Sequence, residues 1–96
     1  MADKLKMTTG SDNVFRDLGF SGQEAENLLL RAELMSQVRA VARGHTQQEA
    51  ARMLGITQPR LNQLLKGKIS LFSLDALVMM LAKAGLRVRM TVKKAA

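Results

Sequence analysis

Residues 47–66 read QQEAARMLGITQPRLNQLLK, and this stretch predicts two short helices joined by a tight turn. Ala51 lies in the middle of the first helix, where a small side chain lets a second helix cross closely. Gly55 falls where the first helix must stop, because a left-handed backbone is cheap only for glycine. The second helix has one face to bury, since apolar residues recur in it at helical spacing. These residues are Ile56, Leu61, Leu64 and Leu65.

The outer face of the second helix carries hydrogen-bonding side chains, which is typical of a helix that reads DNA bases. These residues are Thr57, Gln58, Arg60, Asn62, Gln63 and Lys66. Thr57 precedes the helix, where a hydroxyl accepts a hydrogen bond from an otherwise unpaired amide. Pro59 falls in the first turn, where a missing amide has no helical partner to lose. The stretch therefore predicts a helix-turn-helix with a polar recognition surface.

The spacing of this motif resembles that of the phage-repressor (XRE-like) family of transcription regulators. With Gln47 as position one, alanine falls at the fifth position and glycine at the ninth, and apolar residues fall at the eighth, tenth, fifteenth and eighteenth. The resemblance implies an all-α, lambda-repressor-like bundle that binds a double-stranded DNA operator. The flanking segments, GSDNVFRDLGF before the motif and FSLDALVMMLAKAG after it, resemble those of HigA-type antitoxins and of stand-alone XRE regulators.

Length and composition restrict the class of protein. The chain of 96 residues has room for one domain, and its 3% aromatic content suits packed helices better than a β-sandwich. There is no cysteine, which excludes a disulfide framework and favours an intracellular protein. The longest apolar run, residues 76–82, is far shorter than the roughly 20 residues of a spanning helix. We therefore expect a cytoplasmic protein without membrane contact.

Catalytic and metal-binding patterns are absent from the sequence. No nucleophile is paired with a base, and no phosphate-binding loop can be found. His45 is the only histidine, and it has no second histidine, cysteine or carboxylate arrangement beside it that would hold a metal. We therefore expect no enzymatic activity, no metal and no cofactor.

Charge divides the chain into two unlike parts. Residues 1–38 hold four basic and six acidic side chains, a net charge of −2, whereas residues 39–96 hold eleven basic and two acidic ones, a net charge of +9. A basic segment that contains the motif is the electrostatic pattern expected of a phosphate-binding surface. Basic residues also keep proteins soluble, so the charge favours DNA binding chiefly in combination with the motif.

Capping residues predict where the other helices begin. Ser21 with Glu24, and Thr46 with Glu49, form capping boxes, and Ser73 caps a further helix. The first long helix has an apolar stripe at helical spacing: Ala25, Leu28, Leu29, Ala32, Met35, Val38 and Val41. The last helix has a second stripe, Leu74, Leu77, Val78, Leu81 and Ala84, which Met79 and Met80 widen.

The predicted organisation has three segments. Residues 1–20 form a flexible N-terminal arm, residues 21–85 form the helical domain with the motif at 47–66, and residues 86–96 form a C-terminal strand and basic tail. The arm also contains a small apolar cluster that would pack on the domain or on a second subunit: Val14, Phe15, Leu18 and Phe20.

The tail changes from helical to alternating periodicity, which predicts a short β-strand. Its apolar side consists of Leu86, Val88, Met90 and Val92. A single strand needs a partner for its backbone groups, either the N-terminal arm or the same strand of a second subunit. Pairing across a two-fold axis would give the homodimer that helix-turn-helix proteins use on DNA. The alternative is a frayed basic tail.

The motif predicts two kinds of DNA contact. Sequence reading is assigned to Thr57, Gln58, Arg60, Asn62 and Gln63, because Gln and Asn suit adenine and Arg suits guanine. Phosphate binding is assigned to Arg43, Gln47, Arg52, Lys66 and Lys68, around the edge of the groove. The family resemblance further implies that Gln47 supports Gln58.

Three functional hypotheses follow from the sequence. The chain is an antitoxin that represses its own operon and whose acidic segment, residues 14–33, covers a small basic toxin of the RelE/HigB kind. Alternatively, it is a stand-alone repressor without a toxin partner. The third hypothesis is a helical interaction module that binds no DNA, against which the polar outer face of residues 57–66 argues.

Overall fold

The computed structural model describes residues 14–94, which fold into five α-helices and one short 3₁₀ helix. Two helices at the N-terminal end precede the motif, and one helix follows it. In chain order the elements are α1 (Val14–Asp17), α2 (Gly22–Ala42), α3 (Gln47–Leu54), α4 (Gln58–Leu65), η1 (Ile69–Leu71) and α5 (Leu74–Lys83). The predicted helical fold is confirmed for this part of the chain.

Local capping interactions set the helix starts where the sequence predicts them. At α2, the amide of Glu24 donates to the Ser21 hydroxyl, and the Glu24 carboxylate accepts from the backbone of Ser21. Thr46 and Glu49 form the same reciprocal pair at α3. Each box satisfies amides that the first helical turn leaves unpaired, so both predicted capping boxes are confirmed.

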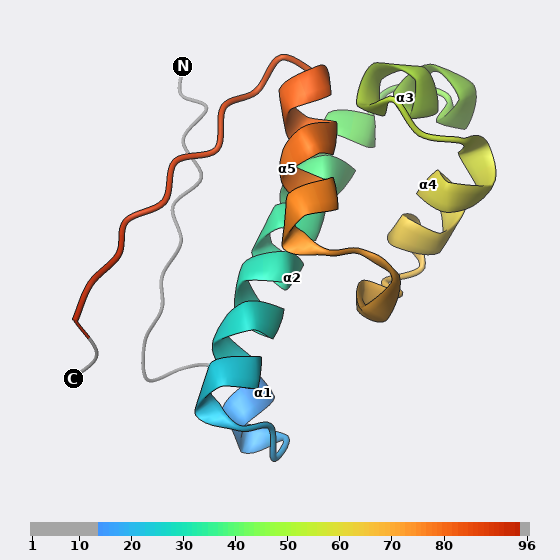
Figure 1. The fold of residues 1–96 in the computed structure, drawn as a ribbon. Helices are drawn as coiled ribbons and strands as arrows, with labels where there is room; N and C mark the ends of the chain where they lie inside the picture. The colour runs from blue at the N-terminus through green and yellow to red at the C-terminus, as the bar shows by residue number, and fades with distance from the viewer. Residues whose placement is uncertain (1–13, 95–96) are drawn as a thin grey trace.

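The long helix α2 is the platform on which the other helices assemble (Figure 1). Helix α5 packs along it, and α1 folds back against its N-terminal end. Helices α3 and α4 contact each other, and they lie together on one side of the α2–α5 pair. The 3₁₀ helix η1 contacts α2 and α4, so the segment after α4 returns the chain to the platform.

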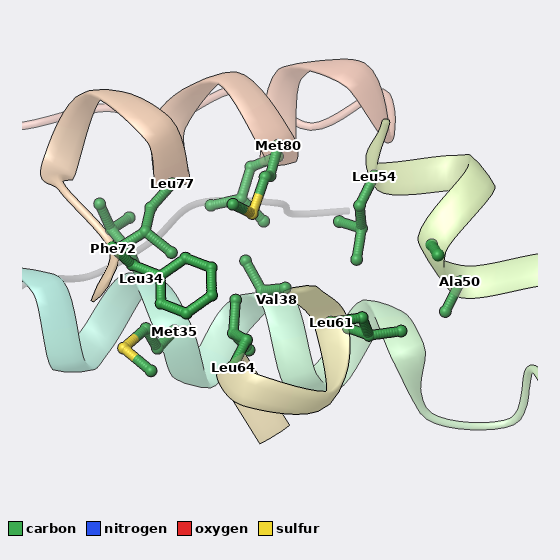
Figure 2. Close-up of a cluster of buried hydrophobic side chains, with 12 residues drawn as sticks. Leu34, Met35, Val38, Ala50, Leu54, Leu61, Leu64, Phe72, Leu77 and Met80 are labelled. Carbon is green, nitrogen blue, oxygen red and sulfur yellow. The ribbon is translucent and has the colours of Figure 1, made fainter. Parts of the chain in front are cut away.

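Figure 2 shows the core, one cluster of buried side chains from α2, α3, α4 and α5 together with Phe72. The largest fully buried side chains are Phe72, Leu34, Leu54, Leu61, Leu64, Leu77, Leu81 and Val38. Full burial of a leucine or phenylalanine side chain stabilises the fold by roughly 1.5–3 kcal/mol. Because both motif helices contribute leucines to this cluster, their orientation is fixed by the main core of the domain.

The predicted apolar stripes differ from the core in two places. Leu34 is fully buried although it is outside the predicted α2 stripe, whose members Leu28 and Leu29 are only half-buried. On α5, Met80 is buried and Met79 is 65% exposed, so only one of the two methionines extends the buried face. The rest of each buried face follows the prediction, since Met35 and Val38 of α2 and Leu77 and Leu81 of α5 are buried members of the predicted stripes.

The predicted C-terminal β-strand is wrong for this structure. Among the described residues no strand is present, and residues 86–94 run as extended chain along the other side of α5 from α3 and α4 (Figure 1). Leu86 and Val88 pack partly against the core, whereas Met90 is 48% and Val92 is 95% exposed. Alternation alone does not make a strand, because the ladder of hydrogen bonds needs a second strand, and the described part of this chain offers none.

The predicted arm at residues 1–20 falls largely on residues 1–13, which lie outside the described residues. Within the described part, residues 14–17 form α1, and the rings of Phe15 and Phe20 meet edge to face with centroids 6.2 Å apart. Of the predicted apolar cluster, Val14 and Leu18 are more than half exposed, and Phe20 is 43% exposed. No helix in residues 14–94 has the length and hydropathy needed to cross a membrane.

Candidate nucleic-acid interface

The turn between α3 and α4 depends on Gly55. This residue has φ 71° and ψ 30°, in the left-handed region that glycine occupies without the clash of a Cβ atom. Its amide donates to the carbonyl of Arg52, and the amide of Ile56 donates to the carbonyl of Ala51. These bonds close the end of α3 in a Schellman motif, so that the chain reverses within three residues and α4 packs across α3.

Both ends of α4 are also capped. The amide of Arg60 donates to the Thr57 hydroxyl at 3.3 Å, as the sequence predicts for an N-cap threonine. At the other end, Gly67 has φ 79°, and its amide and that of Lys68 donate to the carbonyls of Leu64 and Gln63. Helix α4 is therefore eight residues long and capped at both ends, so its exposed side chains keep fixed positions relative to one another.

Helix α4 turns its leucines inward and most of its polar residues outward. Leu61 and Leu64 are fully buried, while Gln58 and Asn62 are exposed. Because Gln58 and Asn62 are four residues apart, they lie one above the other on the same side of the helix. Thr57 is exposed in front of them, and Gln63 is half-buried beside them.

The residues predicted to bind phosphate are all exposed: Arg43, Gln47, Arg52, Lys66 and Lys68. Arg43 follows the end of α2 and Gln47 opens α3, so they are close in sequence on either side of the α2–α3 connection. Lys66 is the C-cap of α4, and Lys68 begins the turn into η1. The structure thus distributes the five side chains around the two motif helices and leaves each open to solvent.

Arg60 differs from the other predicted base-reading residues. Its guanidinium lies 4.4 Å from the centre of the Phe72 ring, and its Nη2 donates to the Leu71 carbonyl at 3.4 Å. The side chain is half-buried between α4 and the junction of η1 with α5. Arg60 precedes the buried Leu64 by four residues, and this spacing already places it on the inner flank of the helix.

Two further arginines, both on α2, also donate to backbone carbonyls. Arg31 of α2 reaches the carbonyls of Ile69 at 3.2 Å and of Phe72 at 3.5 Å. Arg39 of α2 reaches the carbonyl of Leu64, in the last turn of α4, at 3.4 Å. The sequence signal for Arg31 is its position three and four residues before the buried Leu34 and Met35.

The electrostatics of the motif are one-sided. Between residues 50 and 74 the chain contains no aspartate or glutamate, while Arg52, Arg60, Lys66 and Lys68 fall in this segment. The described acidic residues before the motif lie on α1 and α2: Asp17, Glu24, Glu26 and Glu33. Glu49, in the first turn of α3, is the acidic residue of the motif, so exposed cations outnumber carboxylates there and favour binding of a polyanion.

Comparison with known proteins agrees with this geometry. A family model described as a helix-turn-helix domain matches residues 14–93. The chain belongs to this helix-turn-helix family. No curated protein and no solved structure gives a significant match. Membership of the helix-turn-helix family suggests a DNA-binding regulator, and the match extends well beyond α3 and α4 to include α1, α2, α5 and most of the tail.

Proposed function

We propose that this helix-turn-helix protein is a sequence-specific transcriptional repressor of the XRE-like kind, that it acts in the cytoplasm, and that it has no enzymatic activity. The single observation that carries the proposal is the division of α4. Leu61 and Leu64 are buried in the core, while Gln58 and Asn62 of the same short helix are exposed. A helix with this division fits the major groove, which admits one α-helix and offers its donors and acceptors to side-chain amides.

The proposed mechanism assigns affinity and specificity to different residues. Phosphates are bound by the exposed side chains around the motif, namely Arg43, Gln47, Arg52, Lys66 and Lys68. Bases are read by Gln58, Asn62 and Gln63, with Thr57 at the start of the helix. Glutamine and asparagine can pair bidentately with adenine, so we expect A·T pairs in the recognised half-site.

A comparison of wild-type protein with Gln58→Ala tests this assignment. Sites are selected from random duplex DNA with each protein, and affinities are then measured on single-base variants at one salt concentration, since salt alone changes affinity. We expect Gln58→Ala to lose about 1–3 kcal/mol of discrimination at one or two base pairs. Gln37→Ala, the same change at an exposed position of α2, serves as control and should leave every preference unchanged. An unchanged profile for Gln58→Ala would contradict base reading by this residue.

We further propose that the repressor binds as a homodimer. In support, Met90 and Val92 are exposed at the end of an extended segment whose inner part, Leu86 and Val88, packs on the core. A second copy of the chain would cover the exposed side chains of Met90 and Val92. The two recognition helices of such a dimer could reach half-sites about 10 bp apart, or a multiple of that distance. Sedimentation equilibrium of Val92→Asp against wild-type protein tests this: the variant should be more monomeric, and an unchanged association constant would contradict the role of the tail.

The charge distribution favours a second, more specific candidate. The acidic residues Asp17, Glu24, Glu26 and Glu33 lie on α1 and α2, outside residues 50–74, which contain no carboxylate. In the antitoxin hypothesis, this surface covers a small basic toxin of the RelE/HigB kind while α4 represses the shared operon. Co-purification with a small basic protein encoded next to this chain would support the antitoxin role. Operator binding without any such partner would favour the stand-alone repressor.

A further inference from the structure

The first turn of α4 is attached to the rest of the domain through Arg60. Counted from the N-cap Thr57, Arg60 is the third helical residue, so its backbone lies between the exposed Gln58 and Asn62. Its side chain leaves the helix on the inner flank and covers the ring of Phe72, with 4.4 Å between guanidinium and ring centroid. The same guanidinium donates to the Leu71 carbonyl. A cation held over an aromatic face is attracted by the ring's quadrupole, and a planar guanidinium also stacks on it.

The position of Phe72 is fixed by its burial and by its contacts with the other helices. Its side chain is fully buried among residues of α2, α4 and α5 (Figure 2). Its carbonyl accepts from Arg31 of α2 at 3.5 Å, and the next residue, Ser73, caps α5 by accepting from the Ala76 amide. Phe72 therefore cannot move without disturbing α2 or α5. A group stacked on its ring is held in a fixed position relative to both helices.

The far end of α4 has a separate attachment. Arg39 of α2 donates to the carbonyl of Leu64 at 3.4 Å, where cations are also favoured by the helix dipole. The buried Leu61 and Leu64 determine which face of α4 is inside, but leucines leave a helix some freedom to tilt. Arg60 at one end and Arg39 at the other restrict that tilt.

We infer that Arg60 is a positioning residue that sets the angle of the recognition helix through its stack on Phe72, and that it reads no base of its own. The inference rests on the proposed function, since it concerns how α4 is presented to DNA. It replaces the base-reading role that the sequence suggests for Arg60. A reader of one base affects discrimination at that base, whereas a residue that sets the helix angle affects all base contacts of the helix together.

Three proteins and two double-mutant cycles test this inference. Base preferences at every position of the selected half-site are measured for wild-type protein, Arg60→Lys and Arg60→Met, at a temperature where far-UV circular dichroism shows all three to be folded. Lysine keeps the charge but lacks the planar guanidinium, and methionine keeps only the apolar stem. Phe72→Leu is combined with Arg60→Lys, and separately with Asn62→Ala, as a matched pair of cycles.

We expect both Arg60 variants to lose about 5- to 30-fold in operator affinity, with the loss of preference spread over the whole half-site. Non-specific affinity and its salt dependence should stay near wild type for Arg60→Lys. In the Phe72→Leu background, Arg60→Lys should add little further loss, while Asn62→Ala should add its full effect at its own base pair. That combination would support positioning through the ring, because loss of fold or of charge alone does not produce it.

Two results would overturn the inference. Loss confined to one base pair would make Arg60 a base reader, and full recovery of operator affinity by Arg60→Lys would make it a phosphate contact. The proposed function fails separately: if wild-type protein selects no sequence from random DNA, there is no recognition helix to position, and both statements are wrong.

Discussion

Replacing Lys66 with glutamine should weaken binding to every DNA sequence alike and reduce the salt dependence of binding. Lys66 is exposed at the C-cap of α4, at the edge of the predicted groove contact. A lysine near a phosphate releases a condensed counterion when DNA binds, so its loss should lower the slope of log K against log[salt] by about 0.9 per contact. Glutamine keeps most of the side-chain length, so the change removes mainly the charge.

The size of the effect follows from that slope. Between 50 and 200 mM salt, one lost contact changes the ratio of wild-type to variant affinity by about three- to fourfold, and a dimer that loses two contacts changes it by about tenfold. Lys66 also interacts favourably with the C-terminal end of the α4 dipole, which is worth about 0.3–1 kcal/mol to folding. Urea denaturation of the variant separates this small stability loss from the binding effect.

Lys93→Gln is the matched control. It makes the same change of charge in the extended segment 86–94, which lies on the opposite side of α5 from α4 (Figure 1). Fluorescence anisotropy titrations of one labelled duplex over a series of salt concentrations give both slopes. The expected result is a reduced slope for Lys66→Gln and a wild-type slope for Lys93→Gln. Equal changes in the two variants would show that only the net charge matters, and the reasoning from the motif surface would be refuted.

Two stability predictions concern the motif itself, each checked by urea denaturation. Leu61→Ala should lower the free energy of unfolding by about 3–5 kcal/mol, because Leu61 is fully buried, while Leu71→Ala, at a 44% exposed leucine, should cost less than about 1 kcal/mol; similar losses would mean that α4 is not anchored in the core. Gly55→Ala should cost roughly 1–2 kcal/mol, because φ 71° is unfavourable for any residue with a Cβ atom. Gly22→Ala, within the first turn of α2, should be neutral or stabilising, and a neutral Gly55→Ala would contradict the proposed role of the turn.

The parts of the fold that the sequence predicts correctly are those set by nearby residues. The capping boxes at Ser21 and Thr46 and the left-handed turn at Gly55 each depend on atoms within a few residues. The motif spacing could be recognised for the same reason, since the buried and exposed faces of α4 follow from helical periodicity. Here local chemistry and the final structure agree.

The features that the sequence does not predict depend on distant partners. Phe72 is fully buried in the core because side chains of α2, α4 and α5 cover it, and these helices are distant from it or separated from it in the sequence by loops. Arg60 has the residue type of a guanine reader, yet its stacking partner lies 12 residues further along the chain. The alternating tail has the pattern of a strand without a second strand in the described chain to pair with. In each case the missing information is which surface another segment covers.

The most direct test of base contact by α4 is site-specific cross-linking, which is simple here because the chain contains no cysteine. Asn62→Cys and Lys93→Cys each provide a single exposed thiol for a short photoactivatable reagent, the first on the outer face of α4 and the second in the extended tail. On the selected operator, Asn62→Cys should cross-link to one or two defined bases in each half-site, and Lys93→Cys should cross-link to none. Base cross-links from the tail without any from α4 would contradict the proposed recognition helix.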